Sequence, residues 1–134
     1  MARLITIEGI GEVYAAKLQD AGIRTTEALL EATASPMDRQ ALEEKTGIGG
    51  KLILEWANHA DLYRIKGVAE EYSDLLEEAG VDTVPELAQR NPANLHAKMV
   101  QVNIEKELVR RLPTQGQVKD WVAQAKDLPR VLTY

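Results

Sequence analysis

The chain has 134 residues, a formal net charge of −5 at pH 7, 45% apolar residues and 28% charged residues, a composition typical of one globular domain or two very small ones. It contains no Cys and no Phe, which excludes disulfide frameworks and thiolate sites and leaves a largely aliphatic core. The sequence has no apolar run of about 18 residues and no apolar signal segment, so we expect a cytoplasmic protein without a membrane span.

Two helices are predicted near the N-terminus. The first spans about residues 12–21, where apolar side chains recur every three or four positions, and Gly22 behind it is suited to a left-handed C-cap. Thr25 is placed to cap a second helix over about residues 26–31.

Two longer helices follow. The sequence 35–38, Ser-Pro-Met-Asp, is typical of a capped helix start with Pro in the first turn, and this third helix is predicted to end near Gly47. A fourth helix over about residues 51–61 carries an apolar stripe that we expect to be buried. The stripe consists of Ile53, Trp56, Ala57 and Ala60.

The second half of the chain also predicts short helices. Residues 83–86, Thr-Val-Pro-Glu, match a capping box in which the Glu side chain accepts from the Thr amide. Further helices are predicted over about 92–102 and 104–111, and residues 114–117 open the last one. Because no stretch alternates steadily between apolar and polar residues, the sequence predicts an all-α fold without a sheet.

An internal repeat underlies this pattern. When residues 7–29 are placed over residues 65–87, an offset of 58, nine of 23 positions are identical, where ordinary composition gives about one or two. The identical pairs are Ile7/Ile65, Gly9/Gly67, Glu12/Glu70, Tyr14/Tyr72, Leu18/Leu76, Ala21/Ala79, Gly22/Gly80, Thr25/Thr83 and Leu29/Leu87. At an offset of 65, the stripe of the fourth helix meets Val118, Trp121, Val122 and Ala125. We therefore predict one domain made of two copies of a module, about 1–62 and 63–134, that share a core.

Three segments have the form Gly-apolar-Gly, or nearly so, in front of a helix. They are Gly9-Ile10-Gly11, Gly47-Ile48-Gly49 and Gly67-Val68-Ala69. With these segments and the helices that follow, the chain resembles the helix-hairpin-helix family, and as a whole it looks like a small bacterial family of unknown function built from such motifs.

The resemblance implies binding to the DNA backbone without sequence preference. Two glycines let a hairpin approach a phosphate closely, and the amides of the next helix point outward as donors. Carried over to this sequence, the implied contact residues are Gly9, Gly11, Gly47, Gly49 and Gly67. Gly50 and Lys51, which follow the third of these hairpins, complete the candidate set. The resemblance also leaves open whether a monovalent cation binds a hairpin.

Acidic residues surround the first two hairpins. Glu8 and Glu12 flank the first, and Glu70 and Glu71 follow the second, where Ala69 replaces a glycine. A carboxylate at a helix start satisfies the amides and the dipole that a phosphate would use. For these two hairpins, tight turns that serve packing alone are the stronger interpretation.

The third hairpin has a different charge. Lys45 and Lys51 lie on either side of it, and no acid is nearer in the sequence than Glu44. It is the best of the three candidates for a phosphate contact, and a purely structural turn stays open as the alternative.

The last third of the chain is a second candidate. Residues 1–88 hold 8 Lys/Arg and 17 Asp/Glu, a net of −9, and residues 89–134 hold 8 and 4, a net of +4. On the predicted helix over 104–111, Lys106 and Arg110 share a face, and Arg111 lies beside them. The basic residues that extend this patch are Lys98, Lys119, Lys126 and Arg130. Because acidic residues dilute the field, an ordinary solvated helix surface is the alternative.

The sequence contains no catalytic set. His59 and His96 lack ligand or catalytic spacing, and we interpret both as polar residues on helix surfaces. Gly47–Gly50 is too short for a dinucleotide loop and no strand precedes it. Trp56 and Trp121 lie on apolar stripes and are interpreted as core residues rather than a base-stacking platform. We expect no enzymatic activity, cofactor, metal or small-molecule substrate.

Two functions stay open. One is a non-enzymatic protein that binds the nucleic-acid backbone through Gly47–Lys51 and through Lys106, Arg110 and Arg111. The other is a protein-interaction or adaptor module whose acidic and basic parts pair with a partner or with a second copy. The motif favours the first function and the net charge favours the second.

Overall fold

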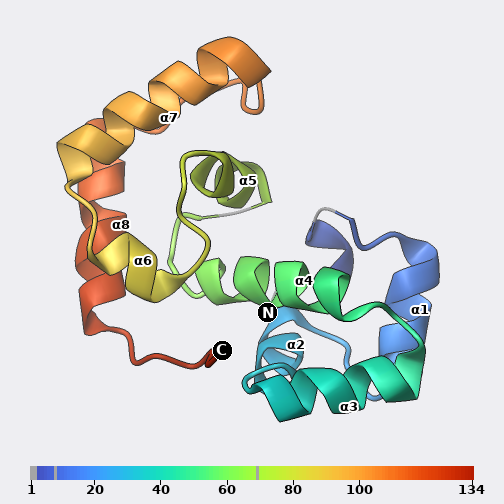
Figure 1. The fold of residues 1–134 in the computed structure, drawn as a ribbon. Coiled ribbons are helices and arrows are strands. Elements are labelled where there is room, and N and C mark those ends of the chain that lie inside the picture. Colours follow the sequence, from blue (N-terminus) through green and yellow to red (C-terminus); the bar gives the residue numbers. More distant parts are fainter. Residues whose placement is uncertain (1–2, 8, 69) are drawn as a thin grey trace. The chain divides into compact units, whose positions relative to one another are not determined.

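The computed structural model describes residues 3–7, 9–68 and 70–134. These residues form one 3-10 helix and eight α-helices joined by turns (Figure 1). Within the described ranges, extended pairing is limited to one isolated bridge between Arg3 and Thr25, so the all-α prediction is confirmed. None of the helices in these ranges is long and apolar enough to span a membrane.

The chain divides into two compact units. Unit 1 comprises residues 1–61 and 130–134, and unit 2 comprises residues 62–129. Unit 1 contains η1 (Leu4–Thr6), α1 (Glu12–Asp20), α2 (Thr26–Ala32), α3 (Pro36–Thr46) and α4 (Gly50–Leu62). Only the last residue of α4, Leu62, is assigned to unit 2. Unit 2 contains α5 (Glu70–Glu78), α6 (Val84–Ala88), α7 (Pro92–Lys106) and α8 (Gln115–Asp127).

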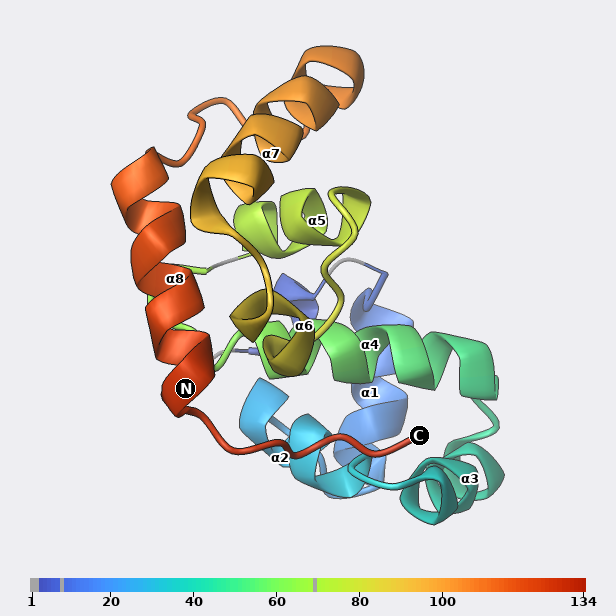
Figure 2. The same cartoon turned by 60° about the vertical axis from the view of Figure 1, so that its left-hand side comes forward.

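Each unit buries one tryptophan in a mainly aliphatic core. Trp56 and Trp121 are each 1% exposed, which confirms their predicted place in the core. The rings of Tyr14 and Trp56 have centroids 5.1 Å apart, and those of Tyr72 and Trp121 are 5.3 Å apart. In unit 2, α8 packs against α6 and α7, and α5 packs against α7 (Figure 2).

Local signals at the starts of α2 and α3 act as predicted. Thr25 Oγ1 accepts from Ala28 N at 3.1 Å. Ser35 Oγ accepts from Asp38 N at 3.1 Å, and Asp38 Oδ2 accepts from Ser35 N at 3.3 Å. These bonds satisfy amides that have no partner inside the helix.

The capping box predicted at the start of α6 is wrong. The Thr83 hydroxyl donates to Glu86 Oε1 at 3.2 Å, and Glu86 Oε2 accepts from Asp82 N at 3.3 Å. The carboxylate therefore binds the Thr83 hydroxyl and the amide one residue earlier, and Thr83 makes no side-chain cap.

The end of α7 also differs from the prediction. The helix runs to Lys106 and the segment behind it is irregular, so the predicted helix over 104–111 is wrong. Glu107 takes the left-handed conformation, with φ 49°, and donates its N–H to Asn103 O at 2.9 Å. The Asn103 side chain then holds Val109, accepting from its N at 3.0 Å and donating to its O at 3.2 Å.

His59 is buried, with 6% of its surface exposed, and the predicted surface position is wrong. It lies three residues after Trp56 on α4, so it shares the buried face of that helix. His96 is half-buried, and its Nε2 lies 2.9 Å from Pro113 O.

Candidate nucleic-acid interface

The first two hairpins have the same backbone turn. Gly9 and Gly67 adopt φ 93° and 96°, in the left-handed region that favours glycine. The bonds that close the two turns run from Ile10 N to Ile7 O at 3.1 Å and from Val68 N to Ile65 O at 3.2 Å. In unit 2, the Gln124 side chain also accepts from Lys66 N at 2.8 Å and donates to Lys66 O at 3.0 Å.

A tryptophan lies behind each of these glycines. A Cβ on Gly9 would lie 3.2 Å from Trp56 Nε1, and a Cβ on Gly67 would lie 2.9 Å from Trp121 Nε1. Both backbone conformation and space therefore call for glycine at these positions. Their presence has a structural explanation that involves no phosphate.

The third hairpin joins α3 to α4. Gly47 ends α3 at φ 74° and donates its N–H to Glu43 O at 2.8 Å. Ile48 is buried, and it anchors the hairpin between the exposed residues Gly47 and Gly49. Gly49 is the N-cap residue of α4, because its O accepts from Ile53 N at 3.2 Å.

Neither packing nor backbone conformation requires glycine at position 49. Apart from its chain neighbours, no heavy atom of the described residues lies within 4 Å of a Cβ placed on Gly49, and its φ lies outside the left-handed region. With no side chain, Gly49 cannot accept from the first-turn amides of α4 as Ser, Thr or Asp would. Lys45 and Lys51 are both exposed on either side of the hairpin, although Lys45 Nζ also donates to Ala21 O at 3.4 Å. Main-chain donors and the positive end of a helix thus meet at this place, with one exposed lysine on either side of it in the sequence.

One carboxylate shares this helix start. A Cβ on Gly50 would lie 2.9 Å from Glu43 Oε1, so the Glu43 side chain reaches the first residue of α4. Glu44 is the nearest acid in the sequence, but Glu43 is the acid whose carboxylate lies beside Gly50. A carboxylate here competes with an external anion for the same field.

The starts of α1 and α8 are built differently. Gly11 is an N-cap glycine with no described atom within 4 Å of its missing Cβ, but exposed Glu12 follows it. At α8, the position that corresponds to Gly49 is Thr114. Its hydroxyl accepts from Gln117 N at 3.1 Å, and Gln117 Oε1 accepts from Thr114 N at 2.8 Å. The chain's own side chains therefore cap α8.

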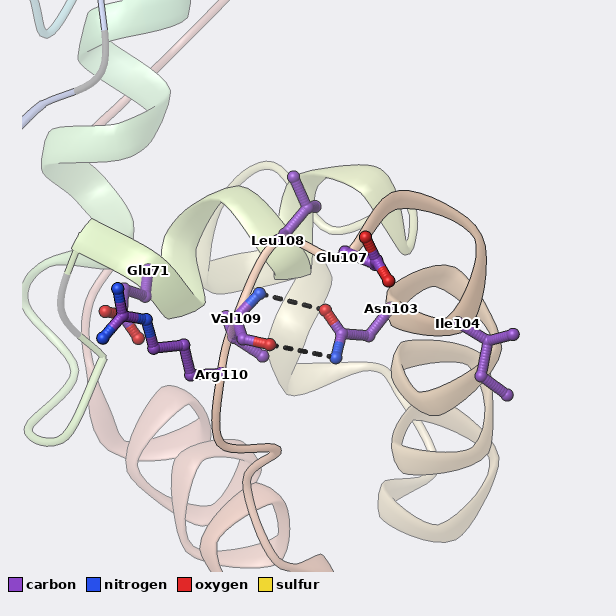
Figure 3. Close-up of a pocket in the computed structure, with 7 residues that line it drawn as sticks. All are labelled: Glu71, Asn103, Ile104, Glu107, Leu108, Val109 and Arg110. Atoms are coloured by element: carbon purple, nitrogen blue, oxygen red, sulfur yellow. Dashed lines mark hydrogen bonds between the residues drawn. The ribbon is translucent and has the colours of Figure 1, made fainter.

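The predicted basic patch does not form on one helix face. Lys106 ends α7, where its Nζ lies 2.5 Å from Glu78 Oε2. Arg110 follows in the irregular segment, so the prediction that it shares a helix face with Lys106 is wrong. Arg110 lines a hollow of about 490 Å³, and the acidic residues Glu71 and Glu107 line the same hollow (Figure 3).

The other basic residues of the predicted patch lie on α7, on α8 and in the segments that follow these helices. Arg111 is exposed, and its carbonyl accepts from Tyr72 Oη at 2.9 Å. Lys98 is exposed on α7, and Lys119 and Lys126 are exposed on α8. Arg130 belongs to unit 1. The extension of the basic patch through these side chains stays a prediction.

A comparison with protein-family models shows to which family the chain belongs. The model of the family DUF4332, described as a domain of unknown function, matches residues 8–128. The chain belongs to the DUF4332 family. The DUF4332 region begins at the first hairpin, ends just after α8 and extends over both units. Neither the curated proteins nor the solved structures give a match.

Proposed function

We propose that this DUF4332 chain is a non-enzymatic protein of tandem helix-hairpin-helix modules that binds the DNA backbone without sequence preference through Gly47–Lys51. The start of α4 carries the proposal, because Gly49 has no side chain to cap the helix and Lys45 and Lys51 are exposed nearby. A phosphate oxygen accepts from the first-turn amides and is stabilised by the helix dipole. Contacts to the phosphate alone carry no sequence information, which accounts for the lack of preference.

The tandem arrangement is supported by equal helix ends in the two units. Ile23 N donates to Leu18 O, and Val81 N donates to Leu76 O, each at 2.9 Å. These four residues are related by the offset of 58 and close the same C-terminal motif behind α1 and α5.

Glu43 limits the strength of binding. Its carboxylate lies at the helix start that the phosphate would occupy, and the whole chain carries a net charge of −5. We therefore expect weak binding, with a dissociation constant of about 1–100 μM at physiological salt and a steep salt dependence.

The test is fluorescence anisotropy of a labelled duplex and a labelled single strand at low and physiological salt. Lys51→Ala should weaken duplex binding by about tenfold near 0.1 M salt and lower the slope of log affinity against log salt by about one. Lys17→Ala, which removes an exposed lysine on α1, is the matched control and should leave both values unchanged. Absence of binding at low salt, or equal effects of the two substitutions, would contradict the proposal.

A protein-interaction module is the second candidate function, and exposed apolar side chains favour it. Ile104 is 75% exposed and Leu108 is 36% exposed. Both line the hollow of Figure 3, beside the two hydrogen bonds that fix Asn103 to Val109. Self-association in sedimentation that Ile104→Ser abolishes, together with no DNA binding in the anisotropy assay, would favour this function over the first.

A further inference from the structure

Residues 130–134 form an extended segment that packs on unit 1 (Figure 2). Leu132 is 2% exposed and anchors the segment. Beside it, Thr133 N donates to Ala34 O at 2.8 Å, and the Thr133 hydroxyl donates to the same carbonyl at 3.3 Å. The segment is therefore held by both its main chain and a buried apolar side chain.

Arg39 on α3 links this segment to the turn between α2 and α3. Its guanidinium donates to Thr33 O at 2.8 Å and to Thr133 O at 2.7 Å, and lies 5.5 Å from the centroid of the Tyr134 ring. Tyr134 Oη in turn donates to Asn58 Oδ1 on α4 at 2.9 Å. The segment is thus held by two hydrogen bonds to its main chain, an apolar anchor and an aromatic ring under a cation. Preformed surfaces that recognise peptides use the same features.

A short connection joins this segment to unit 2. Pro129, the last residue of unit 2, accepts from Arg64 Nη1 at 2.8 Å, and Arg130 behind it is exposed. The contacts of Thr133 and Tyr134 described above are made within unit 1. A second copy that supplied these residues would reproduce every one of those contacts.

We propose that the surface formed by Thr33, Ala34, Arg39 and Asn58 is a peptide-binding site, and that it accepts residues 130–134 of a second copy. The ligand is an extended segment with a leucine anchor, followed by a hydroxyl residue and an aromatic residue. In dilute protein the chain's own segment fills the site, since covalent linkage gives it a high effective concentration. Exchange between copies rises with protein concentration and produces a dimer. This proposal does not depend on DNA binding.

Disulfide trapping tests the exchange, because the chain contains no Cys. We would mix two single variants, Ala34→Cys and Thr133→Cys, incubate them at high concentration and oxidise them. A disulfide-linked heterodimer is expected, since these residues adjoin across the site. The matched control pairs Thr133→Cys with Val13→Cys, which lies 69% exposed on α1. The proposal is overturned if the first pair yields no more cross-linked heterodimer than the control pair.

A labelled peptide of sequence Arg-Val-Leu-Thr-Tyr tests the site itself on the full chain. Leu132→Ala weakens the internal competitor, so we expect this variant to bind the peptide at least about fivefold more tightly than the unsubstituted chain. Addition of Arg39→Ala to Leu132→Ala should abolish binding. If circular dichroism shows folded protein, then equal binding by all three chains, or no binding by Leu132→Ala at about 1 mM peptide, would contradict the site.

Discussion

The starts of α4 and α8 occupy corresponding places in the two halves of the chain, yet their first-turn amides have different surroundings. At α8, Thr114 and Gln117 form a capping box from the chain's own side chains. At α4, Gly49 stands in the place of Thr114 and has no side chain to offer. The difference teaches that a helix start can keep its position in a fold while its first-turn donors gain a side-chain acceptor at the cap in one copy and none in the other.

The glycines show the same division. Gly67 is needed because its φ is 96° and Trp121 leaves no room for a Cβ. Gly49 has neither constraint. The proposed site at α4 depends on this contrast between Gly67 and Gly49, which the substitutions below test at each glycine.

The largest effect is expected from Gly67→Ala, which should lower the free energy of unfolding by about 2–4 kcal/mol. The cost combines a left-handed conformation for Ala with a contact of 2.9 Å to Trp121 Nε1. As a matched control, Gly49→Ala should change stability by less than about 0.5 kcal/mol, because poorer capping is offset by a less flexible unfolded chain. Urea denaturation measures the free energy of unfolding of both variants. Equal losses of stability would contradict the difference between the two glycines.

Thr114→Ala should cost about 1 kcal/mol of stability, because it removes the oxygen that accepts from Gln117 N. Thr114→Ser keeps that oxygen and is the control, with stability expected close to that of the unsubstituted chain. If urea midpoints for Ala and Ser at position 114 coincide, the capping box at α8 does not contribute as described.

Glu43→Gln should raise duplex affinity by about two- to fivefold at low salt, because it removes a negative charge from the start of α4. Glu44→Gln makes the same charge change one residue along, on an exposed side chain, and should have a smaller effect. Anisotropy titrations of the two variants compare them directly. A larger gain from Glu44→Gln would show that general charge, and not position at Gly50, controls binding.

Much of the fold was predictable because its signals are local. Ser35 and Asp38 start α3, Gly47 ends it in the left-handed conformation, and the spacing of the apolar stripe places Trp56 in the core. Each of these depends on residues within one or two helical turns.

Two features escaped prediction because contacts outside the local pattern decide them. The end of α7 depends on the Asn103 side chain, which makes two hydrogen bonds to the main chain of Val109, six residues away. Neither residue type predicts these hydrogen bonds. The position of Glu43 depends on how the third hairpin folds α4 back towards α3. His59 is buried because it follows Trp56 by three residues, a signal that the helical period could have provided.

The most direct test of the site at α4 is duplex binding by Gly49→Ser, measured by anisotropy alongside urea denaturation of the same protein. Ser at the N-cap gives α4 the internal acceptor that Thr114 gives α8, so stability should rise by a few tenths of a kcal/mol or stay unchanged. The same side chain competes with phosphate for the first-turn amides, so DNA affinity should fall by about three- to tenfold. Unchanged affinity in a variant that is at least as stable as the original chain would contradict a phosphate site at the start of α4.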